Sequence, residues 1–301
     1  MIQARTITGY DYTINEVTGE EMLVHQKTGE VVPASWVLIP KGSYCRTPDQ
    51  IAAGQRWREH QQQLHCWRTV SGPFVFVQAE GMLNPVKPAT ATRLIYLATF
   101  LDYQDVLYKT ERTRMKRKDL PSLLGISSSG ANRFWKEVEG RYIYEEKDGE
   151  LRMNSEFFHR GELSGVFGIY QQIYVKPMRS LYRNTNASQH KCLGYVFKML
   201  PYLNTEYNIF CQNPNETEFE EIEPLTVDDF CRLIDYNQHN RARLMEKLAQ
   251  ITFSFEEHEE RFCSITGQQR KLGAEYIRIN PHVIYHGHDA PSVQRVGRFC
   301  A

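Results

Sequence analysis

The sequence lacks long apolar segments that would place the chain in a membrane. It also lacks an excess of basic residues that would make the whole surface positive. No apolar run approaches the roughly 20 residues that span a bilayer. The first 16 residues, MIQARTITGYDYTINE, contain no apolar core of a signal peptide. The net charge is zero, with 36 Lys and Arg against 36 Asp and Glu, which leaves room only for a local basic face. We therefore expect a cytoplasmic protein with no membrane partner.

Common signatures of cofactor and metal chemistry are also missing. Neither G-x-x-x-x-G-K-[ST] nor G-x-G-x-x-G occurs, so no phosphate-binding loop is indicated. The seven cysteines are scattered without a C-x-x-C pair, which favours reduced thiols. His282 and His286 have a spacing that metal sites use, but the segment is expected to be extended, and isolated surface histidines are the preferred interpretation. We expect no catalytic residue, no cofactor and no metal site.

The sequence does contain what looks like the same unit twice. Asp119–Val138 and Asp229–Leu248 can be superimposed at a shift of 110, and each has two short helical patterns separated by a tight break. That arrangement is typical of a helix-turn-helix. The apolar positions that coincide are Leu120 with Phe230, Leu123 with Leu233, Leu124 with Ile234, Phe134 with Leu244, Trp135 with Met245 and Val138 with Leu248.

Two further matches keep the same order along the chain. Leu94–Leu97 parallels Leu193–Val196 at a shift of 99, and Leu151–Asn154 parallels Ile277–Asn280 at a shift of 126. Insertions in loops and in one hairpin would produce the growing shift, because loops tolerate them well. We interpret the pattern as an internal duplication; the alternative is that compact helical domains share apolar spacing without it.

These patterns predict an α+β chain that is mostly helical, with two tandem winged helix-turn-helix domains after a small β-rich N-terminal region and a polar helix. Residues 1–72 form that region, with hairpin turns at Thr18-Gly19 and Thr28-Gly29 and a helix capped by Thr47. The first winged-helix domain covers 73–161, the second covers 173–288, and 289–301 form a flexible tail. Long helices are expected over 89–103 and 187–203, with core tyrosines at positions 96, 103, 195 and 202.

The second helix of the first unit has a polar face suited to DNA. A reading helix packs its apolar face on the domain and inserts its polar face into the major groove. Asn can pair with adenine and Arg with guanine, whereas Lys suits phosphates. The candidate DNA-binding residues of this helix are Ser128, Ser129, Asn132, Arg133 and Lys136. Further candidates are Arg114, Lys116, Arg117 and Lys118 in a basic stretch and Lys147 at a hairpin tip, where neighbouring acids weaken the expectation.

A family resemblance rests on these residues. The segment DLPSLLGISSSGANRFWKEVE is similar to the helix-turn-helix of MarR-type winged-helix regulators. The endings MNSEFFHRG and INPHVIYHG resemble the end of the wing in RepL-type plasmid and phage replication proteins. The resemblance implies a winged-helix fold and DNA binding through the recognition-helix positions. It covers residues 88–161 and, more weakly, 187–287, and the N-terminal 70 residues have no counterpart.

The second unit departs from the family pattern. Arg241 takes the place of Ala131, where a small core residue is expected, so either the helix is rotated or the unit is altered. An acidic segment over residues 213–223 precedes this unit. Residues 88–161 hold 13 Lys and Arg against 11 Asp and Glu, whereas residues 173–287 hold 13 against 15. We expect the first unit to bind DNA better, and the candidates in the second are Asn240, Arg241, Arg243 and Lys247.

The functional expectation is sequence-specific binding of double-stranded DNA without enzymatic activity. Regulation of transcription on a phage or other mobile element is the leading hypothesis. A plasmid or phage replication initiator that binds origin repeats is one alternative, and a winged-helix protein-interaction module without DNA binding is another. Expected protein partners are a second copy of the chain, as a homodimer, or a host transcription or replication protein.

Overall fold

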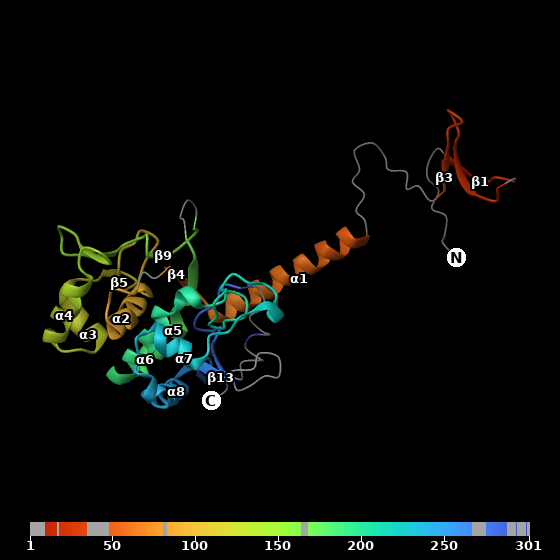
Figure 1. Cartoon of the computed structure of the whole chain (residues 1–301). Coiled ribbons are helices and arrows are strands. Elements are labelled where there is room, and N and C mark those ends of the chain that lie inside the picture. The colour runs from red at the N-terminus through yellow and green to blue at the C-terminus, as the bar shows by residue number, and fades with distance from the viewer. Residues whose placement is uncertain are drawn as a thin grey trace. The chain divides into compact units, whose positions relative to one another are not determined.

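The structure, a computed structural model, describes residues 10–16, 18–34, 48–80, 83–163, 168–266 and 275–287, with Val293 and Phe299, and omits the side chains of residues 48, 49, 60, 63–71 and 266. The chain separates into two compact units, residues 1–59 and 60–301. Figure 1 shows the helices and strands of both units.

The N-terminal unit contains a small antiparallel sheet of three strands in the order β1 (Tyr10–Ile14), β2 (Glu21–His25), β3 (Val31–Pro33). Gly19 and Gly29 have φ values of +70° and +68°. Because glycine enters this left-handed region without steric cost, it suits the tight turns between the strands. Helix α1 spans Pro48–Ser71 and begins at the proline that the sequence indicated. The predicted cap Thr47 lies outside the described residues.

The larger unit is built from two halves with similar element order. The first half contains β4 (Phe74–Gln78), α2 (Pro88–Ala98), β5 (Tyr108–Thr110), β6 (Thr113–Arg114), η1 (Arg117–Asp119), α3 (Leu120–Leu124), α4 (Ser128–Val138), β7 (Ile143–Glu145), β8 (Leu151–Met153) and β9 (Phe158–His159). Backbone bonds join Leu107 to Leu151, so a segment between α2 and α3 lies against the β7–β8 hairpin.

The second half adds α5 and the β11–β12 hairpin to this order and, within its described residues, lacks a counterpart of the β5–β6 hairpin. It contains β10 (Tyr170–Tyr174), α5 (Val175–Arg183), α6 (Ala187–Lys198), η2 (Leu200–Tyr202), η3 (Phe219–Glu221), α7 (Val227–Leu233), η4 (Gln238–Asn240), α8 (Arg241–Ala249), β11 (Thr252–Phe255), β12 (His258–Arg261), β13 (Cys263–Thr266) and β14 (Tyr276–Ile279). The Phe210 amide donates to the Ile277 carbonyl at 3.2 Å, as Leu107 does to Leu151 in the first half.

Fine backbone details recur between the halves. Asp105 and Asn208 have φ values of +64° and +53°, a conformation uncommon outside glycine. The Asp105 carbonyl accepts from Met153, and the Asn208 carbonyl accepts from Ile279. The two halves therefore share local structure where the sequence shows no identity, and the repeat in the sequence corresponds to a repeat in the fold.

Asparagines at the ends of the two hairpins also have the same role. The Asn154 side chain donates to the Arg141 carbonyl at 3.1 Å, and Asn280 donates to the Arg261 carbonyl at 2.9 Å. Each carboxamide oxygen accepts from the amide two residues on. These bonds fix the exit of each hairpin in the same way.

The halves share one core rather than forming separate domains. Strand β4 pairs antiparallel with β10, and Phe76 lies opposite Gln172. Helix α2 packs along α6, and Thr92 Oγ1 donates to the His190 carbonyl at 2.7 Å. A single buried apolar cluster runs from Val75 to Ile284 across both halves.

Gly194 permits the close approach of α2 and α6. A Cβ atom at this position would lie 1.7 Å from the Pro88 carbonyl oxygen. Beside this contact, the Tyr96 ring of α2 stacks on the Tyr182 ring of α5 with centroids 3.8 Å apart. Burial raises the pKa of Tyr182 to about 12, so the stacked phenol stays neutral at ordinary pH.

The expectation of a mostly helical chain is wrong. The described residues form eight α-helices but also fourteen short strands in small antiparallel sheets, so helix does not clearly predominate. The segments after α2 and α6 contribute strands and turns in place of further helix. The chain is α+β, and residues 60–301 form one compact unit.

The predicted helices over 89–103 and 187–203 are too long. Helix α2 ends at Ala98 because the Thr99 hydroxyl donates to the Tyr96 carbonyl and Arg179 donates to the Thr99 carbonyl, both at 2.6 Å. Tyr103, expected in the core, is 72% exposed. Helix α6 gives way to the short 3₁₀ helix η2, which contains Pro201.

The expected surface histidine at position 282 is also wrong, because His282 is buried. Its ring lies against the Phe255 ring, with centroids 3.9 Å apart, and its Nε2 lies 3.8 Å from a Glu260 oxygen. Burial lowers the pKa of His282 to about 4. The described C-terminal residues Val293 and Phe299 are buried as well.

Gly194→Ala should destabilise the protein by about 3 kcal/mol or more, because the added methyl group overlaps backbone that two helices hold in place. In an uncrowded helix the same change would be favourable by about 1 kcal/mol. Denaturant unfolding measures the effect. Lys191→Ala, on the exposed side of α6, is the control and should change stability by less than about 0.5 kcal/mol. A stable Gly194→Ala protein would contradict the close helix contact.

His282 should make the fold sensitive to mild acid. The unfolded state gains a proton below the ordinary histidine pKa near 6.5, whereas the folded state resists it down to about 4. Stability should therefore fall by on the order of 3 kcal/mol as the pH drops through this window. Urea unfolding between pH 7 and pH 4 should show a shallower loss for His282→Gln than for the unmodified protein. Equal slopes would contradict the assignment.

Candidate nucleic-acid interface

The turn between α3 and α4 follows from three adjacent residues. Gly125 ends α3 in the left-handed conformation, with φ +62°. The Ile126 amide then donates to the Pro121 carbonyl at 3.0 Å. Ser127 caps α4, and its Oγ accepts from the Gly130 amide at 3.2 Å. The sequence thus sets the angle at which α4 leaves α3.

Helix α4 has the two faces that the sequence indicated. Ala131, Phe134, Trp135 and Val138 are buried, and Trp135 is among the largest fully buried side chains of the described residues. The opposite face is exposed and places together five of the candidate DNA-binding residues: Ser128, Ser129, Asn132, Arg133 and Lys136. Small residues in the first turn leave room for close approach to a groove.

Glu137, which the sequence analysis did not single out, anchors α4 to the start of α2. One carboxylate oxygen accepts from the Lys87 amide, and the other accepts from Thr90 Oγ1 at 2.9 Å. A carboxylate is favourable at a helix N-terminus, where unpaired amides carry partial positive charge. The sequence signal was an acid at the edge of an apolar face, but its partners are about 50 residues away in the chain.

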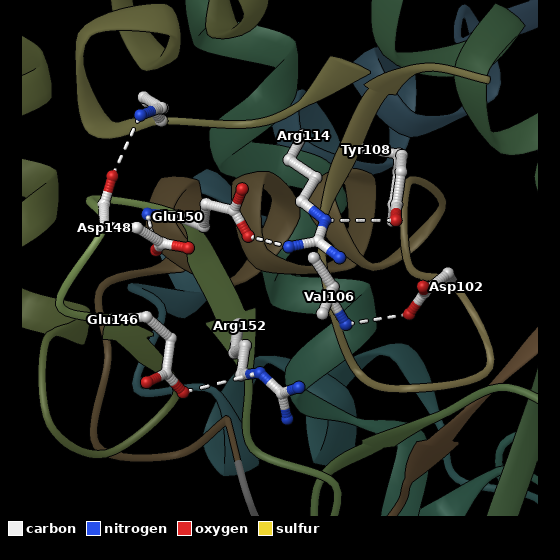
Figure 2. Close-up of polar contacts among 9 residues, drawn as sticks. Asp102, Val106, Tyr108, Arg114, Glu146, Asp148, Glu150 and Arg152 are labelled. Carbon is white, nitrogen blue, oxygen red and sulfur yellow. Dashed lines mark hydrogen bonds and ion pairs between the residues drawn. The ribbon is translucent and has the colours of Figure 1, made fainter. Parts of the chain in front are cut away.

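Part of the basic stretch is held by the β7–β8 hairpin. Figure 2 shows Arg114 between Tyr108 and Glu150, with its guanidinium donating to the Tyr108 hydroxyl at 3.2 Å and to the Glu150 carboxylate. Hydrogen bonds to Tyr108 and Glu150 raise the pKa of Arg114. Lys116 Nζ donates to the Asp148 carbonyl at 2.9 Å. Arg114 and Lys116 therefore hold the hairpin in position, and the oxygen atoms of the hairpin partly compensate their positive charges.

The hairpin has a further ion pair across its own strands. Arg152 Nε lies 3.4 Å from Glu146 Oε1, and Figure 2 shows the two side chains facing each other. Lys147 is exposed at the turn, beside Glu145, Glu146, Asp148 and Glu150. The hairpin tip is therefore predominantly acidic, as the sequence suggested.

Arg117 and Lys118 complete the basic candidates of the first half. Both side chains are exposed. The Arg117 guanidinium lies 5.0 Å from the Trp135 ring centroid, within the range of a cation–π interaction. Arg117 therefore lies against α4 at its Trp135.

The second helix-turn-helix repeats the first turn with different residues. Asp235 takes the left-handed place of Gly125, with φ +52°. Tyr236 donates to the Cys231 carbonyl at 2.8 Å, and Asn237 Oδ1 accepts from the His239 amide at 3.0 Å. Asp119 and Asp229, in equivalent places, each accept from the backbone amide three residues earlier, that of Lys116 at 3.0 Å and that of Thr226 at 3.2 Å. Each of these equivalences has the shift of 110 residues.

The position of Arg241 explains its departure from the family pattern. The first turn after the break is the 3₁₀ helix η4, so α8 begins only at Arg241. The side chain is 54% exposed and pairs with Asp228 of α7 at 2.6 Å. The charge thus lies at the surface, and no small core residue is needed at this point.

Of the other candidates in the second half, two are exposed to solvent and one makes a contact within the fold. Asn240 and Arg243 are exposed. Lys247 Nζ donates to Ser188 Oγ at 2.9 Å, at the start of α6. Lys247 corresponds to Glu137 at the shift of 110; Glu137 ties α4 to the start of α2, and Lys247 ties α8 to the start of α6.

Residues 213–223 form an ordered acidic loop. The Asn213 carboxamide donates to the Glu221 carbonyl at 2.8 Å and accepts from the Glu223 amide at 2.9 Å. Glu218, Glu220, Glu221 and Glu223 are exposed. In the first half the corresponding place, before the helix-turn-helix, holds the basic β5–β6 hairpin. The charge at this place is therefore reversed between the halves.

No known protein family matches this chain, and neither a curated protein nor a solved structure matches it. Among the described residues no three His, Cys, Asp or Glu side chains cluster as a metal site. In the described part of the chain, every helix is too short or too polar to cross a bilayer. No similarity to a known protein therefore assigns a function to the candidate interface.

Proposed function

We propose that the protein binds double-stranded DNA in a sequence-specific manner through α4 and uses this binding to regulate transcription on a phage or other mobile element. The observation that supports the proposal is the exposed face of α4, where Asn132, Arg133 and Lys136 stand together on a helix whose other face is buried. An exposed helix face of this kind fits the major groove.

The chemistry of the face suits both parts of DNA recognition. Arg133 can donate two hydrogen bonds to guanine, and Asn132 can pair with adenine. Lys136, Arg117 and Lys118 are exposed around the helix and suit phosphates, which fix position without reading sequence. The bonds of Glu137 to Lys87 and Thr90 hold α4 itself against the start of α2.

Arg133→Ala should weaken binding to the preferred sequence by on the order of 5- to 150-fold, which corresponds to about 1–3 kcal/mol for a bidentate contact to guanine. Binding to random duplex should change little. Gel-shift titrations at several salt concentrations measure both quantities, and footprinting at a promoter or an origin distinguishes transcription from replication initiation.

Arg58→Ala is the matched control. Arg58 is an exposed arginine on α1, and its Nε donates to the Gly54 carbonyl at 3.2 Å. It should leave the preferred-site affinity unchanged. If Arg133→Ala binds its preferred site as tightly as the unmodified chain, α4 is not the reading helix. If no duplex binds with a salt-dependent affinity, the protein is not a DNA-binding protein.

A further inference from the structure

The two halves are related by a local twofold axis at the β4–β10 pair. Strands β4 and β10 pair antiparallel with Phe76 opposite Gln172, and an antiparallel pair has a local twofold axis between its strands. The outer partners fit the same axis, because Val77 faces Phe158 of β9 and Ile173 faces Ile284. The shift from Phe158 to Ile284 is 126, as in the hairpins.

Both reading helices are tied to this axis by equivalent contacts. Helices α2 and α6 pack on each other. Glu137 links α4 to the start of α2, and Lys247 links α8 to the start of α6. In Figure 1 the α3–α4 pair and the α7–α8 pair lie on opposite flanks of the α2–α6 pair. The helix-turn-helix units are therefore arranged as in a symmetric dimer, within one chain.

A twofold relation between reading helices has a specific consequence for the DNA. Two units related by a rotation of this kind match half-sites on opposite strands, which is an inverted repeat, whereas units related by translation match a direct repeat. We propose that a single copy of this chain binds one duplex site composed of two inverted half-sites. This inference rests on the proposed function and names its substrate.

The half-sites must also be unequal, because the two reading faces differ. Arg133 has its equivalent in Arg243, which is exposed at the same place on α8. Asn132 is replaced by Ala242, and Lys136 is replaced by Glu246. A guanine contact can therefore exist in both half-sites, but the adenine contact and one phosphate contact belong to the first only.

The surroundings of the two helices strengthen this difference. The first has exposed Arg117 and Lys118 nearby, whereas the second follows an ordered loop of exposed glutamates. Acidic side chains near the phosphates oppose binding, so the second half-site contributes less affinity. It adds selectivity for spacing and orientation, since both helices must enter the duplex from one side, about one helical turn or a multiple apart.

The test is selection of duplexes from a random library by the full chain, followed by native mass spectrometry of the selected complex. The expected result is one chain on a site with two inverted, unequal half-sites. Arg133→Ala should relax base preference in the stronger half-site and Arg243→Ala in the weaker one, each by on the order of tenfold at one position. Thermal unfolding of both variants checks that they fold.

Each other outcome overturns the inference in a recognisable way. A selected direct repeat, or one half-site that only Arg133→Ala affects, leaves DNA binding intact but contradicts twofold reading by one chain. A perfect palindrome occupied by two chains would assign the symmetry to a second copy. Failure to select any duplex would instead overturn the proposed function itself, together with this inference.

Discussion

The antiparallel pairing of β4 with β10, with the packing of α2 on α6, is the constraint on which the rest of the larger unit depends. Each half alone would leave an apolar strand and an apolar helix without cover. Joined, they bury one continuous core, and Gly194 lets the two helix backbones approach closely enough for that core to close. Neither half is expected to be a stable domain by itself, since its strand and helix complete their burial against the other.

The same pairing determines how the surface is presented. Because α4 is tied to α2 and α8 to α6, the orientation of each helix-turn-helix follows from the central contact rather than from a linker. Glu137 and Lys247 make these ties with opposite charges. The geometry of the tie is thus retained although the chemistry has changed, which is how duplicated sequences diverge without losing their common fold.

The sequence was a good guide wherever a single segment determines its own structure. The helix-turn-helix boundaries, the buried face of α4 and the turns at Gly19 and Gly29 follow from local spacing and glycine conformation. Long-range contacts were not visible. The end of α2 depends on a hydrogen bond to Thr99 from Arg179, which lies 80 residues away in the chain. The burial of the His282 side chain depends on its packing against Phe255. The helical content was overestimated because the residues after α2 and α6 form turns and single bridges, such as Leu101 with Leu107 and Leu203 with Phe210, which helical spacing does not reveal.

Arg241 is a charged residue at a position where the sequence repeat predicts a small core residue, and the local structure keeps it at the surface. A charge in a core position would cost several kcal/mol if buried without a partner. The 3₁₀ turn of η4 delays the start of α8, the side chain stays at the surface, and Asp228 supplies the opposite charge. That pair leaves Arg241 less free to contact phosphate than an unpaired arginine, and the acidic loop acts in the same direction. The second half therefore shares the scaffold of the first but has a more acidic surface before its helix pair. Under the proposed DNA binding, the two halves would contribute unequally.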